Sequence, residues 1–176
     1  MNQKISAQLQ QIDTKLNKLL SDLQQYSDEK LNHKPTPESW SVVQVLQHLM
    51  LVENASAKYV QKKLSYNPKL SKVNLGTAWR MLILKSYNWL PIKLKAPSYV
   101  NENNFAEQAV LADVAAKWQE QRRQLRDYLA TLPDTIYDKE VYKHPLAGRL
   151  SLNGMLQFYE GHFDRHYKQI QRLLKN

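Results

Sequence analysis

The sequence contains no cysteine, and only 4 of its 176 residues are glycine. The absence of cysteine excludes disulfide bonds, thiolate zinc sites, iron–sulfur clusters and a cysteine nucleophile, and it is compatible with the cytoplasm. Few glycines, and almost no alternation of apolar with polar residues, argue against an extensive sheet. We therefore expect an all-α protein.

The sequence also lacks an apolar run long enough to span a membrane. Its most apolar window, residues 78–94, is interrupted by polar side chains and a proline, namely Arg80, Lys85, Asn88, Pro91 and Lys93. Residues 1–20 have the pattern of a polar amphipathic helix and not that of a signal peptide. We expect a cytoplasmic protein with no membrane partner.

Positive charge is in excess, but no basic tail is present. Lys and Arg outnumber Asp and Glu by 25 to 16, which gives a formal net charge of +9 and favours an anionic partner. The basic residues are dispersed, without an arginine-rich run or a base-reading motif. This distribution is more typical of a solvated surface than of a nucleic-acid groove, so we expect no specific nucleic acid to bind.

The apolar residues recur at helical spacing, and the chain length suits a single domain over residues 1–176. We predict main helices over residues 3–30, from Ser39 or Ser41 onward, over 107–132 and over 151–174. Residues 77–90 form a further helix that stops at Pro91, and a loop follows to residue 104. This crossover either packs as a connector or covers one end of the bundle as a lid.

The last predicted helix carries two histidines on its apolar stripe. That stripe runs through Leu152, Met155, Tyr159, His162, His166, Ile170 and Leu173. One helical turn places the Cβ atoms of His162 and His166 about 5–6 Å apart, close enough to share a metal ion. From this helix alone, His162 and His166 can be interpreted equally well as hydrogen-bonded core residues or as half of a metal site.

His48 takes a similar inward position in the second predicted helix, and Glu53 borders the same stripe as the nearest carboxylate in sequence. The two remaining histidines stand in predicted loops, and His144 directly precedes a proline. We expect His33 to be exposed and His144 to have a structural role.

Three sequence features together resemble the DinB-like superfamily, also called the DinB/YfiT family. They are the segment W-S-V-V-Q-V-L-Q-H-L at 40–49, a His-Pro-x-x-Gly turn at 144–148, and His162, His166, Gln169 and Ile170 in the last helix. The resemblance covers nearly the whole chain. It implies a four-helix bundle of up-down-down-up type, with a long helical and loop crossover between the second and third main helices.

The resemblance also implies a metal site, because in that family a histidine of the second helix and two of the last bind a divalent ion, usually nickel or zinc. Residue by residue, this assigns His48, His162 and His166 as ligands. Three imidazoles leave a coordination position open, which is typical of a catalytic site. Nitrogen ligation by itself does not select among zinc, nickel, copper and iron.

The function expected from the resemblance is that of a metal-dependent hydrolase or thiol S-transferase acting on a small molecule, such as a low-molecular-weight thiol. Glu53 and Tyr159 lie near the ligands by helical spacing and are candidates for catalytic roles. The alternatives are a non-catalytic binding or stress-response module stapled by the metal, and a nucleic-acid binder. A homodimer is compatible with such a bundle, although the sequence shows no clear exposed apolar seam.

Overall fold

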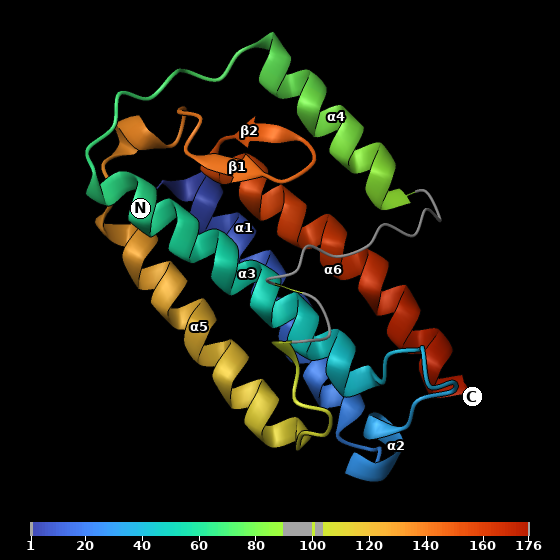
Figure 1. Cartoon of the computed structure of the whole chain (residues 1–176). Coiled ribbons are helices and arrows are strands. Elements are labelled where there is room, and N and C mark those ends of the chain that lie inside the picture. Colours follow the sequence, from blue (N-terminus) through green and yellow to red (C-terminus); the bar gives the residue numbers. More distant parts are fainter. Residues whose placement is uncertain (1, 90–99, 101–103, 176) are drawn as a thin grey trace.

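A computed structural model of the chain describes residues 2–89, 100 and 104–175 (Figure 1). Its helices are α1 (Gln3–Leu23), α2 (Asp28–Asn32), α3 (Val42–Ser65), α4 (Leu75–Trp89), α5 (Leu111–Thr131) and α6 (Leu152–Lys175). A short 3-10 helix, η3 (Asp134–Ile136), precedes a hairpin of β1 (Tyr142–His144) and β2 (Gly148–Leu150). The protein is mostly helical, as predicted.

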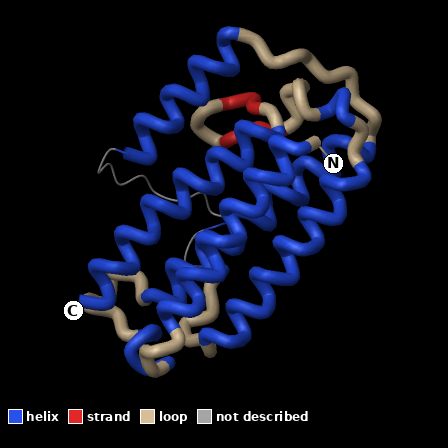
Figure 2. The backbone as a smooth tube through the Cα atoms, turned by 180° about the vertical axis from the view of Figure 1, so that it is seen from behind, coloured by secondary structure: helices blue, strands red, loops and turns tan. Residues whose placement is uncertain are grey.

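The four long helices α1, α3, α5 and α6 form a bundle. Helices α1 and α6 run in one direction, whereas α3 and α5 run in the other (Figures 1 and 2). Because α3 and α5 are parallel neighbours, the chain must return along the whole bundle between them. It does so through α4, which packs against α6. Residues 90–99 and 101–103 of the predicted crossover, including most of the predicted lid, lie outside the described residues.

The start of α3 is fixed by its own sequence. The Ser41 side chain accepts a hydrogen bond from the backbone N–H of Gln44, and the Gln44 side chain accepts one from the backbone N–H of Ser41. This reciprocal capping box satisfies two amides that the first helical turn would leave free. Of the two predicted starting serines, Ser41 is the cap, and His48 follows on the buried face of the helix.

The first helix is shorter than predicted. Instead of one helix over residues 3–30, α1 ends at Leu23 and the chain turns before α2. Ser27 caps α2 by accepting a hydrogen bond from the backbone N–H of Lys30. A serine that caps a helix in this way stabilises the start of α2, and it does not favour an extension of α1 through the same residues.

Two other boundaries differ from the prediction. Helix α5 begins at Leu111 and not at residue 107, because the Asp28 side chain of α2 accepts the backbone N–H of Leu111. The predicted His-Pro-x-x-Gly turn at 144–148 lies within an antiparallel hairpin of β1 and β2, whose strands were not predicted. At its second strand, Gly148 has a φ of 80°, which glycine adopts without steric cost.

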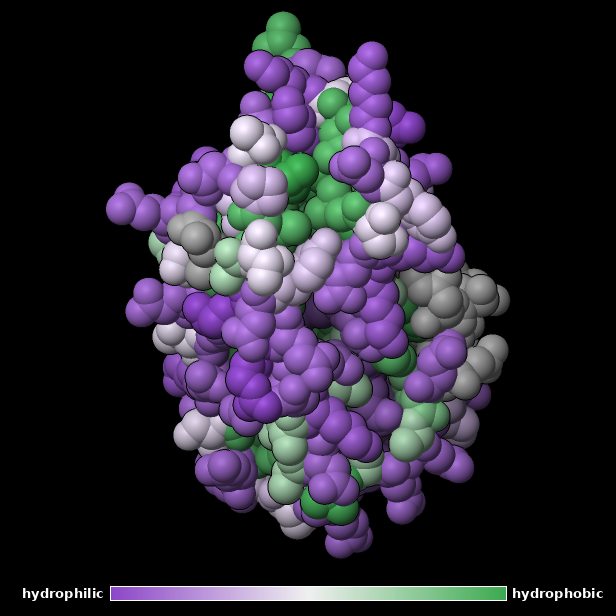
Figure 3. All heavy atoms as spheres, turned by 90° about the vertical axis from the view of Figure 1, so that its left-hand side faces the viewer, coloured by the Kyte–Doolittle hydropathy of each residue, from purple (hydrophilic) through white to green (hydrophobic). Residues whose placement is uncertain are grey.

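The bundle interior is apolar along its length. Each long helix buries one stripe, and that of α1 consists of Ile5, Leu9, Ile12, Leu16, Leu19, Leu20 and Leu23. On the face shown in Figure 3, hydrophilic side chains cover most of the lower half, while apolar atoms gather in the upper half. Among the described residues, no helix is both long and apolar enough to cross a membrane.

One polar network crosses this apolar core. The Glu53 carboxylate of α3 accepts hydrogen bonds from the side chains of Trp118 and Arg122 in α5. Arg122 also pairs with Asp13 of α1 at 3.0 Å, and the Tyr159 hydroxyl of α6 donates to the backbone carbonyl of Glu53 at 3.0 Å. Burial by itself would lower the pKa of Arg122, but the two carboxylates raise it, so the guanidinium stays charged.

Replacing Arg122 should strongly destabilise the fold. In Arg122→Ala, Glu53 would stay buried without its cationic partner, and breaking such a pair costs about 3–5 kcal/mol. The neighbouring Arg123 is the matched control, because its side chain is 69% exposed whereas that of Arg122 is 4% exposed. Urea unfolding followed by circular dichroism should show this loss for Arg122→Ala and a change under about 0.5 kcal/mol for Arg123→Ala. Equal effects in the two variants would contradict the importance of the network.

Candidate metal centre

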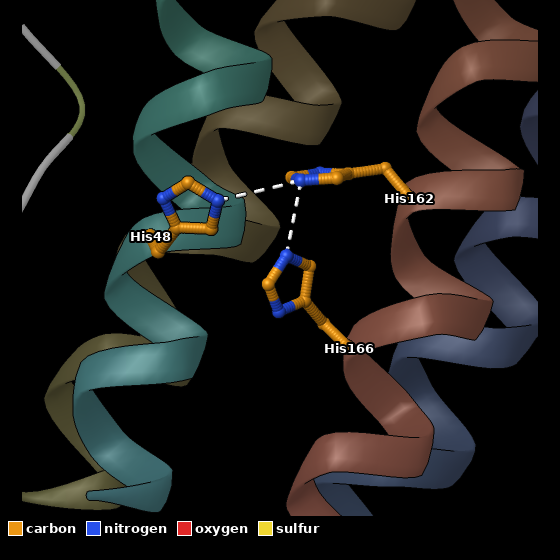
Figure 4. A group of neighbouring side chains, drawn as sticks. All are labelled: His48, His162 and His166. Carbon is orange, nitrogen blue, oxygen red and sulfur yellow. Dashed lines mark hydrogen bonds between the residues drawn. The ribbon is translucent and has the colours of Figure 1, made fainter. Parts of the chain in front are cut away.

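Three imidazoles converge in the space between α3 and α6 (Figure 4). The Nε2 atom of His162 lies 3.3 Å from Nε2 of His48 and 3.1 Å from Nε2 of His166. One nitrogen atom from each of the three rings lies within 4.8 Å of the other two. His48 is buried, whereas His162 and His166 are half-buried. The fold therefore gathers the three histidines that the sequence singled out, and their site keeps contact with the surface.

Two of these rings are held by hydrogen bonds through Nδ1. The Nδ1 atom of His48 lies 2.9 Å from the backbone carbonyl oxygen of Val100, and that of His166 lies 2.8 Å from Oε1 of Gln169. Neither oxygen can donate a hydrogen bond, so each Nδ1 carries the proton and donates it. Both rings thus present an Nε2 lone pair to the centre of the cluster, which is the tautomer that metal-binding histidines use.

Protons alone cannot satisfy this cluster of neutral rings. His162 could donate from Nε2 to either His48 or His166, and one lone pair would still face another nitrogen at hydrogen-bond distance. A cation at the centre would satisfy all three lone pairs together. The donor set therefore fits a divalent transition metal, with three nitrogen ligands and room for a further ligand.

Electrostatics keep the rings neutral. Burial lowers the pKa of His48, and it lowers that of His166 to about 3. The pKa of His162 falls well below its ordinary value, first because of burial and then because of the neighbouring imidazoles. A histidine must be deprotonated at the coordinating nitrogen to bind a metal. The site is therefore in its binding form at neutral pH.

Aromatic rings surround the imidazoles. The ring of Trp40 lies 5.1 Å from that of His48, and the ring of Phe105 lies 6.3 Å from it. On the other side, Phe158 stacks on His162 at 5.2 Å. These side chains lower the local polarity, which strengthens electrostatic interactions inside the site.

The two residues predicted as catalytic candidates point into the polar network and not into the histidine cluster. The Glu53 carboxylate is engaged by Trp118 and Arg122, and the Tyr159 hydroxyl by the carbonyl of Glu53. Burial raises the pKa of Tyr159 well above its usual range, so its hydroxyl stays protonated. Catalytic roles for Glu53 and Tyr159 remain predictions.

The two other histidines lie where they were expected. His33 is exposed in a loop. His144 is buried and accepts backbone N–H groups of Leu146 and Ala147 through Nδ1, which supports the hairpin turn. A surface hollow of about 660 Å³ lies between α2 and the start of α5, where it is lined by His33 but by none of the three clustered histidines.

The residues that orient the ligands were not assigned this role from the sequence. Gln169 was noted in the closing motif, and its position three residues after His166 on a helix was the available signal. No pattern could have identified Val100, because it contributes only a backbone carbonyl from a segment that is distant in sequence.

The fold and the site define a helical-bundle protein with three convergent histidines between its second and fourth long helices. A sequence model of the DinB superfamily matches residues 8–170, which is most of the chain. The chain therefore belongs to the DinB superfamily.

Two comparisons extend this assignment. The chain is 26% identical over 165 residues to the uncharacterized protein YuaE of Bacillus subtilis strain 168, with 87% of this chain and 88% of YuaE covered. A solved structure of YfiT from Bacillus subtilis matches with a TM-score of 0.64 and 18% identity, covering 98% of this chain and 87% of YfiT. That protein is described as "a probable metal-dependent hydrolase with an unusual four-helix bundle topology". At this identity, the likeness shows that the two proteins share the fold.

The hydrogen bond from His166 to Gln169 should strengthen metal binding. Gln169→Leu keeps a similar volume but removes the acceptor that holds the ring, and loss of such a partner typically weakens metal affinity by about 10- to 100-fold. Gln171→Leu is the matched control, because it makes the same change on another side of α6. Competition with a coloured chelator measures the affinities, and equal affinities in the two variants would contradict the role of Gln169.

The buried His144 should make the metal-free protein sensitive to acid. Burial lowers its pKa to about 4, from an ordinary value of 6.5. The unfolded chain therefore binds a proton at a higher pH than the folded chain does, and stability is lost as the pH falls from 6.5 toward 4. This residue alone should cost about 2 kcal/mol of unfolding free energy between about pH 7 and pH 5. Denaturant unfolding at both pH values should show a smaller loss in His144→Gln, and an unchanged loss in the exposed control His33→Gln.

Proposed function

We propose that this protein is a metal-dependent enzyme, a hydrolase or a thiol S-transferase, that acts on a small molecule at an ion held by His48, His162 and His166. The observation that carries the proposal is the convergence of three Nε2 lone pairs, two of them fixed by Nδ1 hydrogen bonds. Nickel and zinc are the ions we favour, because imidazole suits both and the family resemblance implies them. The shared fold with YfiT, described as a probable metal-dependent hydrolase, supports the same class.

The chain's own residues would prepare this chemistry. A bound divalent ion supplies a Lewis acid, which activates a water or thiol nucleophile and polarises a carbonyl group. Val100 and Gln169 hold two imidazoles in the coordinating tautomer. Glu53 and Tyr159 make hydrogen bonds within the polar network, and these contacts support a positioning role more than a proton-transfer role.

The surroundings of the site indicate what kind of substrate it would accept. Trp40, Phe105 and Phe158 offer apolar surface around the histidines, which fits a small molecule with an apolar portion next to its reacting group. A low-molecular-weight thiol is a suitable second substrate, since sulfur is a good ligand for zinc. Half-burial of His162 and His166 leaves a route for both molecules.

The main alternative is a non-catalytic module in which the metal staples the bundle. It is favoured by one observation: His48 lies on α3, whereas the other two ligands lie on α6, where His162 is 114 residues further along the chain. An ion at this place would cross-link two helices and stabilise the folded state over the unfolded one. A staple, however, needs no open coordination position and no contact with the surface.

Metal content is the first measurement for the proposal. Protein purified without an affinity tag should contain about one transition-metal ion per chain by elemental mass spectrometry, because three nitrogen ligands form one site. His48→Ala and His166→Ala should both lose it. The control His33→Ala changes an exposed histidine outside the cluster and should retain the metal. If the wild-type protein also fails to bind added nickel and zinc, the metal-site proposal is wrong.

Turnover measurements distinguish the enzyme proposal from the non-catalytic module in which the metal only cross-links the bundle. The metal-loaded protein should turn over a compound in a panel of ester, amide, epoxide and thiol-conjugation reactions, and His162→Ala should abolish that turnover with little change in melting temperature. A large fall in melting temperature in His162→Ala, together with no turnover by the wild type on any of the panel, would favour the staple.

A further inference from the structure

Helix α4 has an apolar stripe on each of two opposite sides. Its inner stripe packs onto the bundle: Thr77 and Leu84 are buried, and Met81 lies so close to Gly154 of α6 that a Cβ atom there would come within 3.1 Å of its sulfur. The other stripe faces solvent, because α4 packs on the outside of the bundle against α6 (Figure 1). We call this stripe the outer face of α4, and it consists of Leu75, Trp79, Leu82 and Ile83.

The outer face is unusually exposed for its composition. Its side chains are 89%, 64%, 54% and 50% exposed, in sequence order. Their spacing of four, three and one residues aligns them along one side of the helix over about two turns. Single exposed apolar residues are ordinary on protein surfaces, but a contiguous apolar patch marks an interaction site. A helix that is apolar on both sides is expected to be covered on both.

The net charge of the whole chain arises in the sequence segment that contains this helix. Residues 54–101 contain nine Lys and Arg and no Asp or Glu, while the remaining 16 basic residues equal the 16 acidic residues of the chain. The formal net charge of +9 therefore comes from this one segment, which runs from the end of α3 through the following loop and α4 to residue 101. In the described structure, five of these lysines are exposed and form no ion pair with a described carboxylate: Lys58, Lys62, Lys69, Lys72 and Lys85.

The two basic residues of α4 lie on either side of its outer face. Around the helix axis, Arg80 lies just beyond one edge of the stripe and Lys85 just beyond the other. Lys85 is exposed, and Arg80 is half-exposed while it pairs with Glu140 at 3.0 Å, which holds α4 against the segment before the hairpin. An apolar stripe with tryptophan and cationic borders is the pattern of helices that lie in the plane of a membrane surface.

We propose that the outer face of α4 binds the surface of an anionic lipid bilayer. Trp79, Leu82 and Ile83 would enter the boundary between headgroups and acyl chains, and Lys85 at the border of the stripe would contact lipid phosphates. This association needs no membrane-crossing helix. It does not involve the metal site, because α4 packs on α6 through its inner stripe, at Gly154, and the outer face points away from the bundle.

Other partners fit the outer face less well. A second copy of the chain would place two acid-free segments against each other, and like charges across a symmetric contact are unfavourable. Duplex DNA would satisfy the lysines but would leave the leucine and isoleucine side chains uncovered. An acidic protein groove would contact α4 alone, whereas the potential of an anionic bilayer also attracts basic residues that do not touch it.

Vesicle flotation tests the proposal with the full chain. Binding should be weak to phosphatidylcholine vesicles and clear to vesicles in which about a quarter of the lipid is phosphatidylglycerol, and salt should reduce it. The double variant Trp79→Ser/Ile83→Ser should bind roughly tenfold less tightly or worse, because it removes most of the inserted apolar surface. Val110→Ser is the matched control, since it changes an exposed apolar residue at 48% exposure outside the segment. His162→Ala should bind as the wild type does.

Each other outcome would overturn the proposal. Absence of flotation with anionic vesicles, or flotation that the double variant retains in full, would exclude insertion of the outer face. If the protein instead binds duplex DNA or polyglutamate but not vesicles, the basic segment recognises a nucleic acid or an acidic protein. Concentration-dependent dimers in solution that the double variant abolishes, without vesicle binding, would assign the outer face to a second copy of the chain.

Discussion

The arrangement of the bundle depends on the buried pairing of Glu53 with Arg122. Through this carboxylate and its backbone carbonyl, α3 is joined to α5 and to α6, and Arg122 extends the network to α1. Burying two charges costs solvation free energy that their attraction only partly recovers, so such a pair contributes more to a unique arrangement than to net stability. A helix that shifted along its axis or rotated would leave a charge without its partner. The network thus selects one register among many apolar packings of similar energy.

That register sets the geometry of the histidine cluster. Glu53 follows His48 by five residues on α3, and Tyr159 precedes His162 by three residues on α6, so the tyrosine hydrogen bond lies close to the ligands on both helices. Without a cation, the cluster can form only one of its two hydrogen bonds between Nε2 atoms, and one lone pair still faces another nitrogen. The polar network therefore supplies the preorganisation, and the site keeps three nitrogen atoms converging at a separation that apolar packing alone would not maintain.

The sequence was sufficient for the features that depend on local pattern. The apolar stripes predicted the four long helices, the serines at 39 and 41 predicted the start of α3 to within two residues, and the spacing of His162 and His166 indicated their shared face. What the sequence could not show are contacts between distant residues. Asp28 caps α5 from 83 positions away, and Arg122 meets Glu53 from 69 positions away. The break after Leu23 has no glycine or proline to signal it, and the three-residue strands are too short to show alternation.

The distribution of the ligands along the chain has a consequence for how the protein is made. His48 belongs to the second long helix, whereas His162 and His166 belong to α6, which follows all the other bundle helices in sequence. While a ribosome synthesises the chain, α1, α3 and α5 emerge with apolar stripes that α6 is not yet present to cover. The three-histidine site forms only when α6 docks. Metal capture at this site would therefore be a late step in biogenesis, and a truncated chain would not compete for the ion with a finished one.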